Sequence, residues 1–142
     1  MYENLENEEI YRIPPELKKD AHEGYKKRKR FVGMCAQAGV QILAGTDGPG
    51  LGTLLPGFGL HHELELLVEA GLTTLQAIQA ATLLAARALN QEKEIGSVET
   101  GKFADLLILD ANPFEKISNS RQIHLVLKDG RIFDPTKMKV SR

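Results

Sequence analysis

Asp47 is the residue whose type and position point most directly to chemistry. The short apolar run Val40–Ala44 comes before it, separated from it by one glycine and one threonine. A Gly- and Pro-rich stretch, 48–59, comes directly after it. The run predicts a buried strand, with Asp47 at its carboxyl end beside a loop. A carboxylate placed there can bind a divalent metal ion or take a proton from a metal-bound water. The alternative is a turn aspartate that only caps the next segment.

Two adjacent histidines, His61 and His62, follow this loop at the start of a helical pattern. Neighbouring residues on a helix point about 100° apart, so they seldom chelate one ion, and metal-binding helices use H-x-x-x-H spacing instead. We expect one ring to be packed or to face a substrate and the other to lie in solvent. His22 is the only histidine before Asp47, and no H-x-H occurs.

Other motifs for nucleophilic or nucleotide chemistry are missing. The Gly-rich stretch has neither G-x-G-x-x-G spacing nor a phosphate-loop lysine, and no G-x-S-x-G occurs. Cys35 is the single cysteine, so no intramolecular disulfide forms, and a buried inert thiol is expected. His124 alternates with apolar neighbours and is expected on the surface of a strand or half-buried in it.

Three helices are expected to position these residues. The first covers residues 16–38 and ends at Gly39, and the second covers 60–70 and ends at Gly71. The third begins after Thr73, which forms a capping box with Gln76, and runs to Asn90. The inner faces are predicted to hold Leu60, Leu64, Leu67 and Val68 in the second helix, and Leu75, Ile78, Thr82, Ala85 and Leu89 in the third.

The part after Asn90 predicts a small antiparallel β unit. Its expected strands are 95–98, 104–109, 123–128 and 131–133, and the last two flank Asp129-Gly130, a favoured two-residue hairpin turn. A few short strands cannot bury both faces alone, so the unit should pack on another element. Residues 1–13 are acidic and are expected to be a tail or a poorly packed lead-in.

Size and charge limit the function classes. With 142 residues the chain is too short for a complete (β/α)₈ barrel of about 250. Eighteen basic and nineteen acidic residues give a net charge of -1, which offers no reason to expect a nucleic-acid or membrane partner. The basic run between residues 18 and 30 is interpreted as a solvated helix face. No signal peptide or membrane-length apolar run is evident, and a cytoplasmic location is expected.

Taken together, these segments resemble the amidohydrolase superfamily, in its imidazolonepropionase-like and Xaa-Pro dipeptidase-like branch. Each segment alone matches the family weakly, but the order and spacing of the segments over about residues 20–134 are specific to it. The residues that carry the likeness are Ile42–Asp47, Leu60–Thr73, Gln76–Thr82 with Ala85-Ala86, Gly96-Ser97 with Gly101–Asp110, and Val126–Arg131.

The resemblance implies an α/β fold made from the C-terminal piece of a metal-dependent-hydrolase TIM barrel. Residues 1–90 would supply its last strand and helices, and 91–142 a small antiparallel part of the composite β-sandwich. It implies hydrolysis of amide or peptide-like C–N bonds with a divalent metal, zinc being the expected ion. Asp47 would touch the metal and accept a proton from the attacking water, and His61 would contact a small-molecule or peptide-like substrate.

The chain also departs from the family pattern. The family's H-x-H pair, its mid-barrel lysine or carboxylate and its two further histidines all lie upstream of the matched region. One carboxylate cannot form a closed metal site. We therefore expect a fragment that holds no metal alone and whose exposed strand edges need the missing barrel portion or a homo-oligomer partner. The alternatives are a non-catalytic α/β module that pairs with another chain and, least favoured, nucleic-acid binding through residues 18–30.

Overall fold

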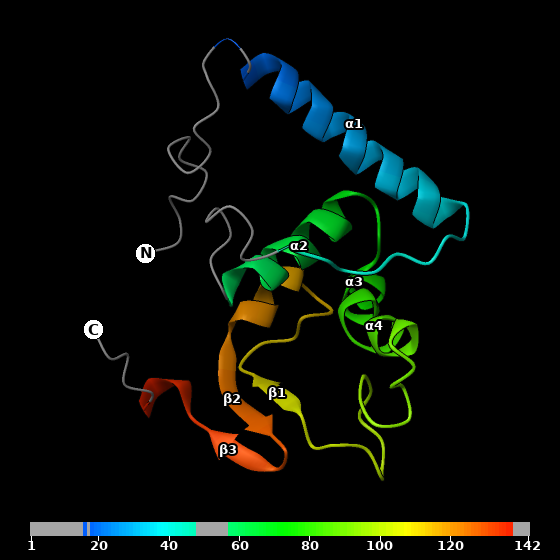
Figure 1. The fold of residues 1–142 in the computed structure, drawn as a ribbon. Coiled ribbons are helices and arrows are strands. Elements are labelled where there is room, and N and C mark those ends of the chain that lie inside the picture. The colour runs from blue at the N-terminus through cyan, green and yellow to red at the C-terminus, as the bar shows by residue number, and fades with distance from the viewer. Residues whose placement is uncertain (1–15, 17, 48–56, 138–142) are drawn as a thin grey trace.

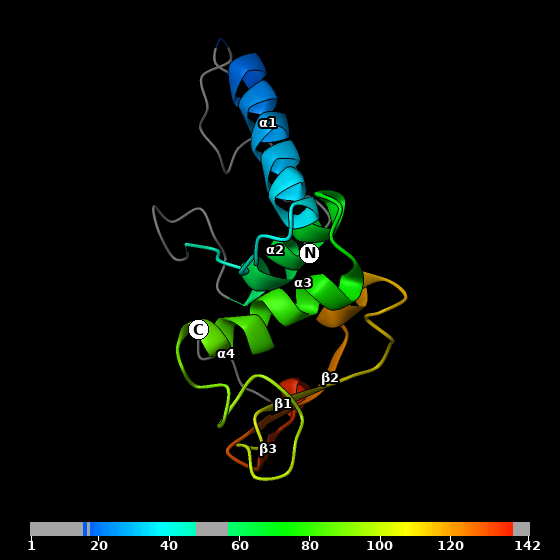
Figure 2. The ribbon, with the colours of Figure 1, turned by 90° about the vertical axis from the view of Figure 1, so that its right-hand side faces the viewer.

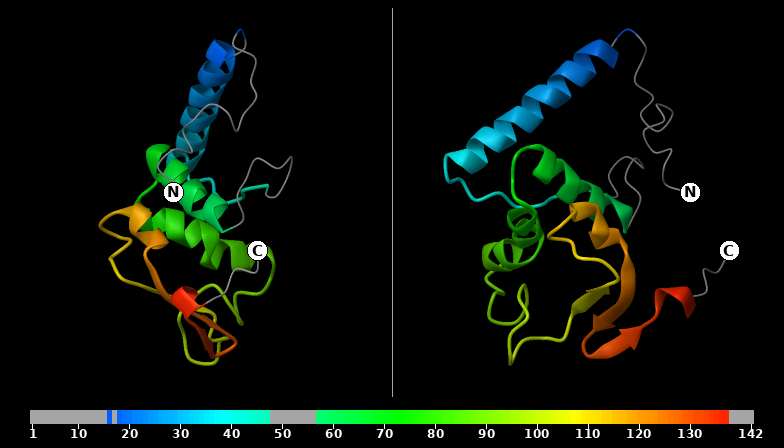
Figure 3. Two further views of the ribbon diagram at one scale, coloured as in Figure 1. Left: turned by 90° about the vertical axis from the view of Figure 1, so that its left-hand side faces the viewer. Right: turned by 180° about the vertical axis from the view of Figure 1, so that it is seen from behind.

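The computed structural model describes residues 16, 18–47 and 57–137, arranged in three tiers (Figure 1). Helix α1 forms one end, helices α2, α3 and α4 form the middle, and a three-stranded sheet forms the other end. Views from the left-hand side and from behind agree on this order (Figure 3). Helices with a small antiparallel sheet confirm the expected α/β class. The expected lead-in, 1–13, lies outside the described residues, as does most of the Gly-rich loop.

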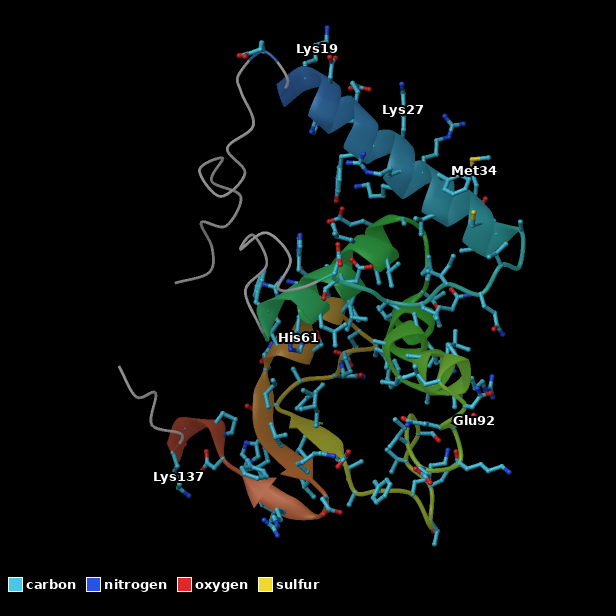
Figure 4. All side chains as sticks on the ribbon, in the orientation of Figure 1. Lys19, Lys27, Met34, His61, Glu92 and Lys137 are labelled. Carbon is cyan, nitrogen blue, oxygen red and sulfur yellow. The ribbon has the colours of Figure 1, made fainter. Side chains whose placement is uncertain are left out.

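Helix α1 (Lys18–Gln37) confirms the first predicted helix and rises away from the rest of the molecule (Figure 2). Its C-terminal half approaches α2 (Phe58–Glu69) closely, because Gly33 has no side chain where it meets Ala70. Lys29 pairs with Glu69 at 2.9 Å nearby. Lys19, Lys27 and Met34 project away from α2 (Figure 4). Within the described residues, no helix has the length and apolarity needed to span a membrane.

The prediction of a strand at Val40–Ala44 is wrong, because this extended segment pairs with no other described strand and joins no sheet. The Ala44 N–H donates to the carbonyl of Ala80, which belongs to a helix. A strand requires a neighbour with which to exchange backbone hydrogen bonds, and no described strand pairs with this segment. It still alternates as a strand does, since Ile42 and Ala44 pack on the core while Leu43 is 44% exposed.

The core lies between the middle helices and the segment that precedes β2 (Ile123–Lys128). Helix α2 begins at Phe58, two residues earlier than predicted, after Gly57 at φ 82°. Its predicted inner residue Leu60 is 44% exposed, whereas two other leucines of the stripe are buried. The buried cluster consists of Leu64, Leu67, Leu72, Ala77, Ala80 and Ile117.

The third predicted helix is broken at Thr82 into α3 (Thr74–Ala81) and α4 (Leu83–Ala88). Thr82 has φ −126° and ψ −93°, and its hydroxyl donates to the carbonyl of Ile78 at 2.7 Å. A threonine that bonds back to the preceding turn competes with the helical ladder and bends it. The buried face also differs from the predicted one: Leu75 and Leu89, expected inside, are exposed, and the buried residues of α3 and α4 are alanines.

The capping box at the start of α3 is confirmed. The Gln76 N–H donates to the Thr73 hydroxyl at 3.2 Å, and the Thr73 N–H donates to the Gln76 side chain at 2.8 Å. Asn90, the predicted stop, adopts a left-handed φ of 57° just after α4. These local signals therefore determine where the middle helices begin and end.

The strand expected at 95–98 is absent, and residues 95–97 form a bend instead. Gly96 adopts φ 92° and packs against α4, where a Cβ atom would lie 2.6 Å from the Ala86 side chain. The Lys102 amine hydrogen-bonds to the Ser97 hydroxyl and pairs with Glu99 at 3.2 Å. The lysine side chain is only 10% exposed, so the turn encloses most of it.

The sheet is antiparallel, with the order β1 (Leu106–Leu109), β2 and β3 (Arg131–Phe133). Asp129 and Gly130 have φ 51° and 72°, so the predicted hairpin turn with two positive φ angles is confirmed. Two 3₁₀ helices flank the last strands, η3 (Ile117–Arg121) and η4 (Pro135–Lys137). The expectation that this unit packs on another element holds only for η3, whose Ile117 joins the helical core, because no residue of β1, β2 or β3 is buried. The domain division at residue 90 stays a prediction.

Candidate functional site

Asp47 lies at the end of the extended segment, with its side chain exposed and φ 51°. Along 42–47 half-buried and exposed residues alternate, and Asp47 belongs to the exposed set with Leu43. The opposite set, which includes Ile42 and Ala44, packs on the helical core. The φ of 51° at Asp47 is left-handed, so the extended backbone ends before this residue, and its exposure rather than strand alternation places it at the surface.

His61 lies in the first turn of α2, half-buried between that helix and η3 (Figure 4). Its Nδ1 atom is 3.0 Å from the hydroxyl oxygen of Ser120, a residue that is 7% exposed. His62 is exposed and lies 3.6 Å from Glu65. The expectation of one packed ring and one solvated ring is thus confirmed, and the packed ring is held by a residue 59 positions away in the chain.

A charged and aromatic cluster fastens η3 to the same end of α2. Arg121 forms an ion pair with Glu65 and stacks its guanidinium over the Phe58 ring, 4.7 Å from the centroid. The Phe58 ring in turn stacks on His62, with centroids 5.9 Å apart. Arginine stacked on an aromatic face and paired with a carboxylate is well fixed in space, so this cluster restrains the surroundings of His61.

Burial lowers the pKa of His61 below its usual 6.5, and the nearby positive charge of Arg121 lowers it further. Glu65 acts in the opposite direction but is the smallest of the three influences. Desolvation and a like charge both disfavour the imidazolium form. His61 is therefore a neutral imidazole at neutral pH, able to donate one hydrogen bond and accept another.

The described residues do not form a metal centre. No three His, Cys, Asp or Glu side chains among them come close enough together to hold an ion. Protein sites for zinc use three or four protein donors, whereas Asp47 stands as one exposed carboxylate. Oxygen donors of this kind suit divalent ions, but a single one does not complete a site.

The structure gives no direct contact between the two predicted site residues. Within residues 18–47 and 57–137, no hydrogen bond or ion pair joins Asp47 to His61. Sequence reasoning also missed Ser120 and Arg121, the residues that surround His61. Neither lies in a motif, and only the packing of η3 on α2 brings them to the histidine.

Cys35 and His124 take no part in this site. Cys35 is a free, half-buried thiol on α1. His124 is an exposed residue of β2, as one of the two expected placements had it, and lies 2.9 Å from Asp110. That surface pair fastens the end of β1 to β2.

A family model and individual curated proteins give the same family for this sequence. The sequence profile described as "Amidohydrolase family" matches residues 16–133. A 5-methylthioadenosine/S-adenosylhomocysteine deaminase from Thermoanaerobacter pseudethanolicus is 35% identical over 85 residues, which are 56% of this chain and 20% of that protein. An imidazolonepropionase from Geobacillus sp. is 40% identical over 68 residues, 46% of this chain and 16% of that one.

Solved structures give the same result. A Xaa-Pro dipeptidase crystallised with methionine in its active site superposes with a TM-score of 0.68 and 35% identity, covering 75% of this chain and 25% of that chain. A molinate hydrolase gives a TM-score of 0.67 and 28% identity, covering 78% and 27%. The chain thus matches about a fifth of the curated relatives and about a quarter of the solved ones. Since the profile covers well over half of its residues, the chain belongs to the amidohydrolase family.

Proposed function

We propose that this chain is part of a metal-dependent hydrolase of C–N bonds, such as amide or peptide-like bonds. The family membership carries the proposal, together with the position of Asp47 at the end of an extended, alternating segment. The relatives are named as deaminases, an imidazolonepropionase and a dipeptidase, and deaminases and dipeptidases act on C–N bonds. Because the match covers only 20%, 16% and 25% of those three chains, the proposed activity belongs to the whole enzyme and not to this chain alone.

The segment before Asp47 also supports a more detailed proposal for the fold. We infer that residues 40–47 act as a strand of a (β/α)₈ barrel whose other strands pair with it, and that α2 is the helix after it. In such barrels side chains alternate between the helical layer and the barrel interior, and the active site lies at the carboxyl ends of the strands. The packing of Ile42 on the core and the exposure of Leu43 and Asp47 support that placement.

Asp47 is the proposed catalytic carboxylate. In the complete enzyme it would supply one oxygen to the metal ion, with zinc as the expected ion, and would take up the proton of the attacking water. His61 is the proposed substrate contact. Its half-buried, neutral ring can hydrogen-bond an uncharged or anionic substrate group without placing a second positive charge beside Arg121.

A chimeric enzyme tests this proposal. Residues 16–133 replace the matching quarter of the Xaa-Pro dipeptidase chain, and dipeptide hydrolysis and bound zinc are measured. We expect a folded, zinc-loaded chimera to hydrolyse the substrate, and Asp47→Asn to reduce kcat by at least about 100-fold, as loss of a general base does. Asp129→Asn is the matched control, because Asp129 has the same φ of 51° and is also exposed.

The outcomes separate the competing interpretations. A folded chimera with no activity would favour the non-catalytic module, and an Asp47→Asn chimera as active as its parent would remove Asp47 from the reaction. The 142-residue chain by itself is expected to bind less than one equivalent of zinc in equilibrium dialysis. Stoichiometric zinc in this chain, lost in Asp47→Asn, would contradict the view that the other donors lie elsewhere.

A further inference from the structure

The contact between His61 and Ser120 decides which nitrogen of the ring carries the proton. A neutral imidazole has one N–H and one unprotonated nitrogen, and the partner of each nitrogen fixes the choice. Here Nδ1 is 3.0 Å from the Ser120 hydroxyl. Either Nδ1–H donates to the hydroxyl oxygen, or the hydroxyl donates to an unprotonated Nδ1.

The burial of Ser120 favours the second arrangement. Its residue is 7% exposed, so its hydroxyl proton has little access to water. In the described part of the chain, the hydroxyl makes no hydrogen bond other than the one to His61 Nδ1. A buried hydroxyl proton without an acceptor is unfavourable, and Nδ1 is the acceptor within reach. The hydroxyl therefore donates to Nδ1, and the ring proton belongs on Nε2.

We propose that Ser120 is a positioning residue that fixes His61 in the Nε2–H form, so that the ring offers an N–H donor to an oxygen of the substrate. This rests on the proposed role of His61 as a substrate contact. A carboxylate or carbonyl oxygen of a peptide-like molecule is the matching acceptor. The same tautomer keeps Nε2 from acting as a metal ligand or as a base, which leaves those roles to Asp47 and to other donors.

The surroundings of the ring are consistent with a fixed, uncharged donor. Within the described residues, no hydrogen bond engages Nε2, and the residue is half-buried rather than fully enclosed. Arg121 is already engaged by Glu65 and by the Phe58 ring, so its charge stays beside the imidazole and opposes protonation. The cluster thus fixes the position of η3 and favours the uncharged form of His61.

Nitrogen NMR on the full 142-residue chain tests the tautomer directly. Long-range ¹H–¹⁵N correlation at about pH 7.5 separates protonated from unprotonated ring nitrogens, and His61→Gln identifies which of the four histidine signals belongs to this ring. We expect an unprotonated Nδ1 and a protonated Nε2. A protonated Nδ1 in the unsubstituted chain would overturn the proposal, whatever the variants do.

Variants of η3 then test the cause. Ser120→Ala is expected to lower the ratio of Nε2–H to Nδ1–H forms by about tenfold, the effect of losing one hydrogen bond. Ser120→Thr keeps the hydroxyl and is expected to restore the ratio, and Ser118→Ala, a half-buried serine of the same 3₁₀ helix, leaves it unchanged. An unchanged ratio in Ser120→Ala would refute the positioning role. Because this measurement needs no turnover, it stands apart from the chimera: an inactive chimera with the expected tautomer would refute the hydrolase function alone.

Discussion

A Cβ atom on Gly33 of α1 would lie 2.1 Å from the carbonyl oxygen of Ala70, at the end of α2. No side chain fits at that distance, so the two helices approach each other only because residue 33 is glycine. Gly33→Ala is expected to lower the free energy of unfolding by about 1–3 kcal/mol, as overpacking does. Urea denaturation followed by circular dichroism measures the change.

Gly24 of the same helix is the matched control. A Cβ atom there would meet only Arg28, at an ordinary 3.5 Å. Alanine is more stable than glycine inside a helix, so Gly24→Ala should raise the free energy of unfolding by about 0.5–1 kcal/mol. Equal stabilisation by both substitutions would contradict the close contact between α1 and α2.

The capping box gives a second stability prediction. Thr73→Ala removes the hydroxyl that accepts the Gln76 N–H at 3.2 Å, which leaves a helix-terminal donor unpaired. The expected loss is about 1 kcal/mol in the free energy of unfolding, measured by urea denaturation. Thr73→Ser keeps the oxygen and should retain most of the stability. A serine variant as unstable as the alanine variant would assign the loss to the methyl group instead.

The pKa of His61 predicts how stability depends on pH. This pKa is lowered from 6.5 in the folded chain, so the unfolded chain takes up the proton first on acidification. The contribution of His61 is complete above 6.5 and declines as the pH falls from 6.5 toward the lower folded pKa. Urea midpoints at about pH 7.5 and pH 5.5 should show the decline.

Two substitutions assign that decline to the ring. His61→Gln removes the titrating group, so the difference between the two midpoints should shrink. His22→Gln, on the exposed side of α1, is the control for losing an imidazole without this packing. A pH dependence that survives in His61→Gln would show that another group causes it.

Asp134 gives a prediction at lower pH. The Thr136 hydroxyl, the Lys137 amine and the Thr136 N–H together lower the pKa of this carboxyl to about 2. Hydrogen bonds to the ionised form favour it, and the hydroxyl is the largest influence. Thr136→Ala should raise the Asp134 pKa, and Thr136→Ser should preserve it. Carbon-detected NMR titration of the carboxyl measures the change, and equal pKa values in both variants would contradict the assignment.

The elements that the sequence predicted correctly are those with local causes. Thr73 and Gln76 cap a helix within one turn, and Asp129-Gly130 has the positive φ angles that its hairpin needs. Such signals operate over a few residues, whatever the rest of the chain does. The same reasoning placed the end of α4 near Asn90.

The errors lie where distant contacts decide. A strand exists only with a partner, so the apolar run before Asp47 is extended but unpaired in the described structure. The break at Thr82 is the exception, because its cause is local: its hydroxyl bonds back to Ile78, four residues earlier, in a segment whose apolar spacing predicted one continuous helix. In the candidate site, residue type singled out Asp47 and His61, but no periodicity links His61 to Ser120, 59 residues away.

The turn around Lys102 has a practical consequence for labelling experiments. Its amine bonds to Ser97 and Glu99 and its side chain is 10% exposed, whereas the side chain of Lys137 is 83% exposed. Acylating reagents attack free, accessible amines, so in the native chain Lys102 should be modified far more slowly than Lys137. The extent of Lys102 acylation, determined by mass spectrometry, would thereby serve as an internal gauge of correct folding in every variant described above.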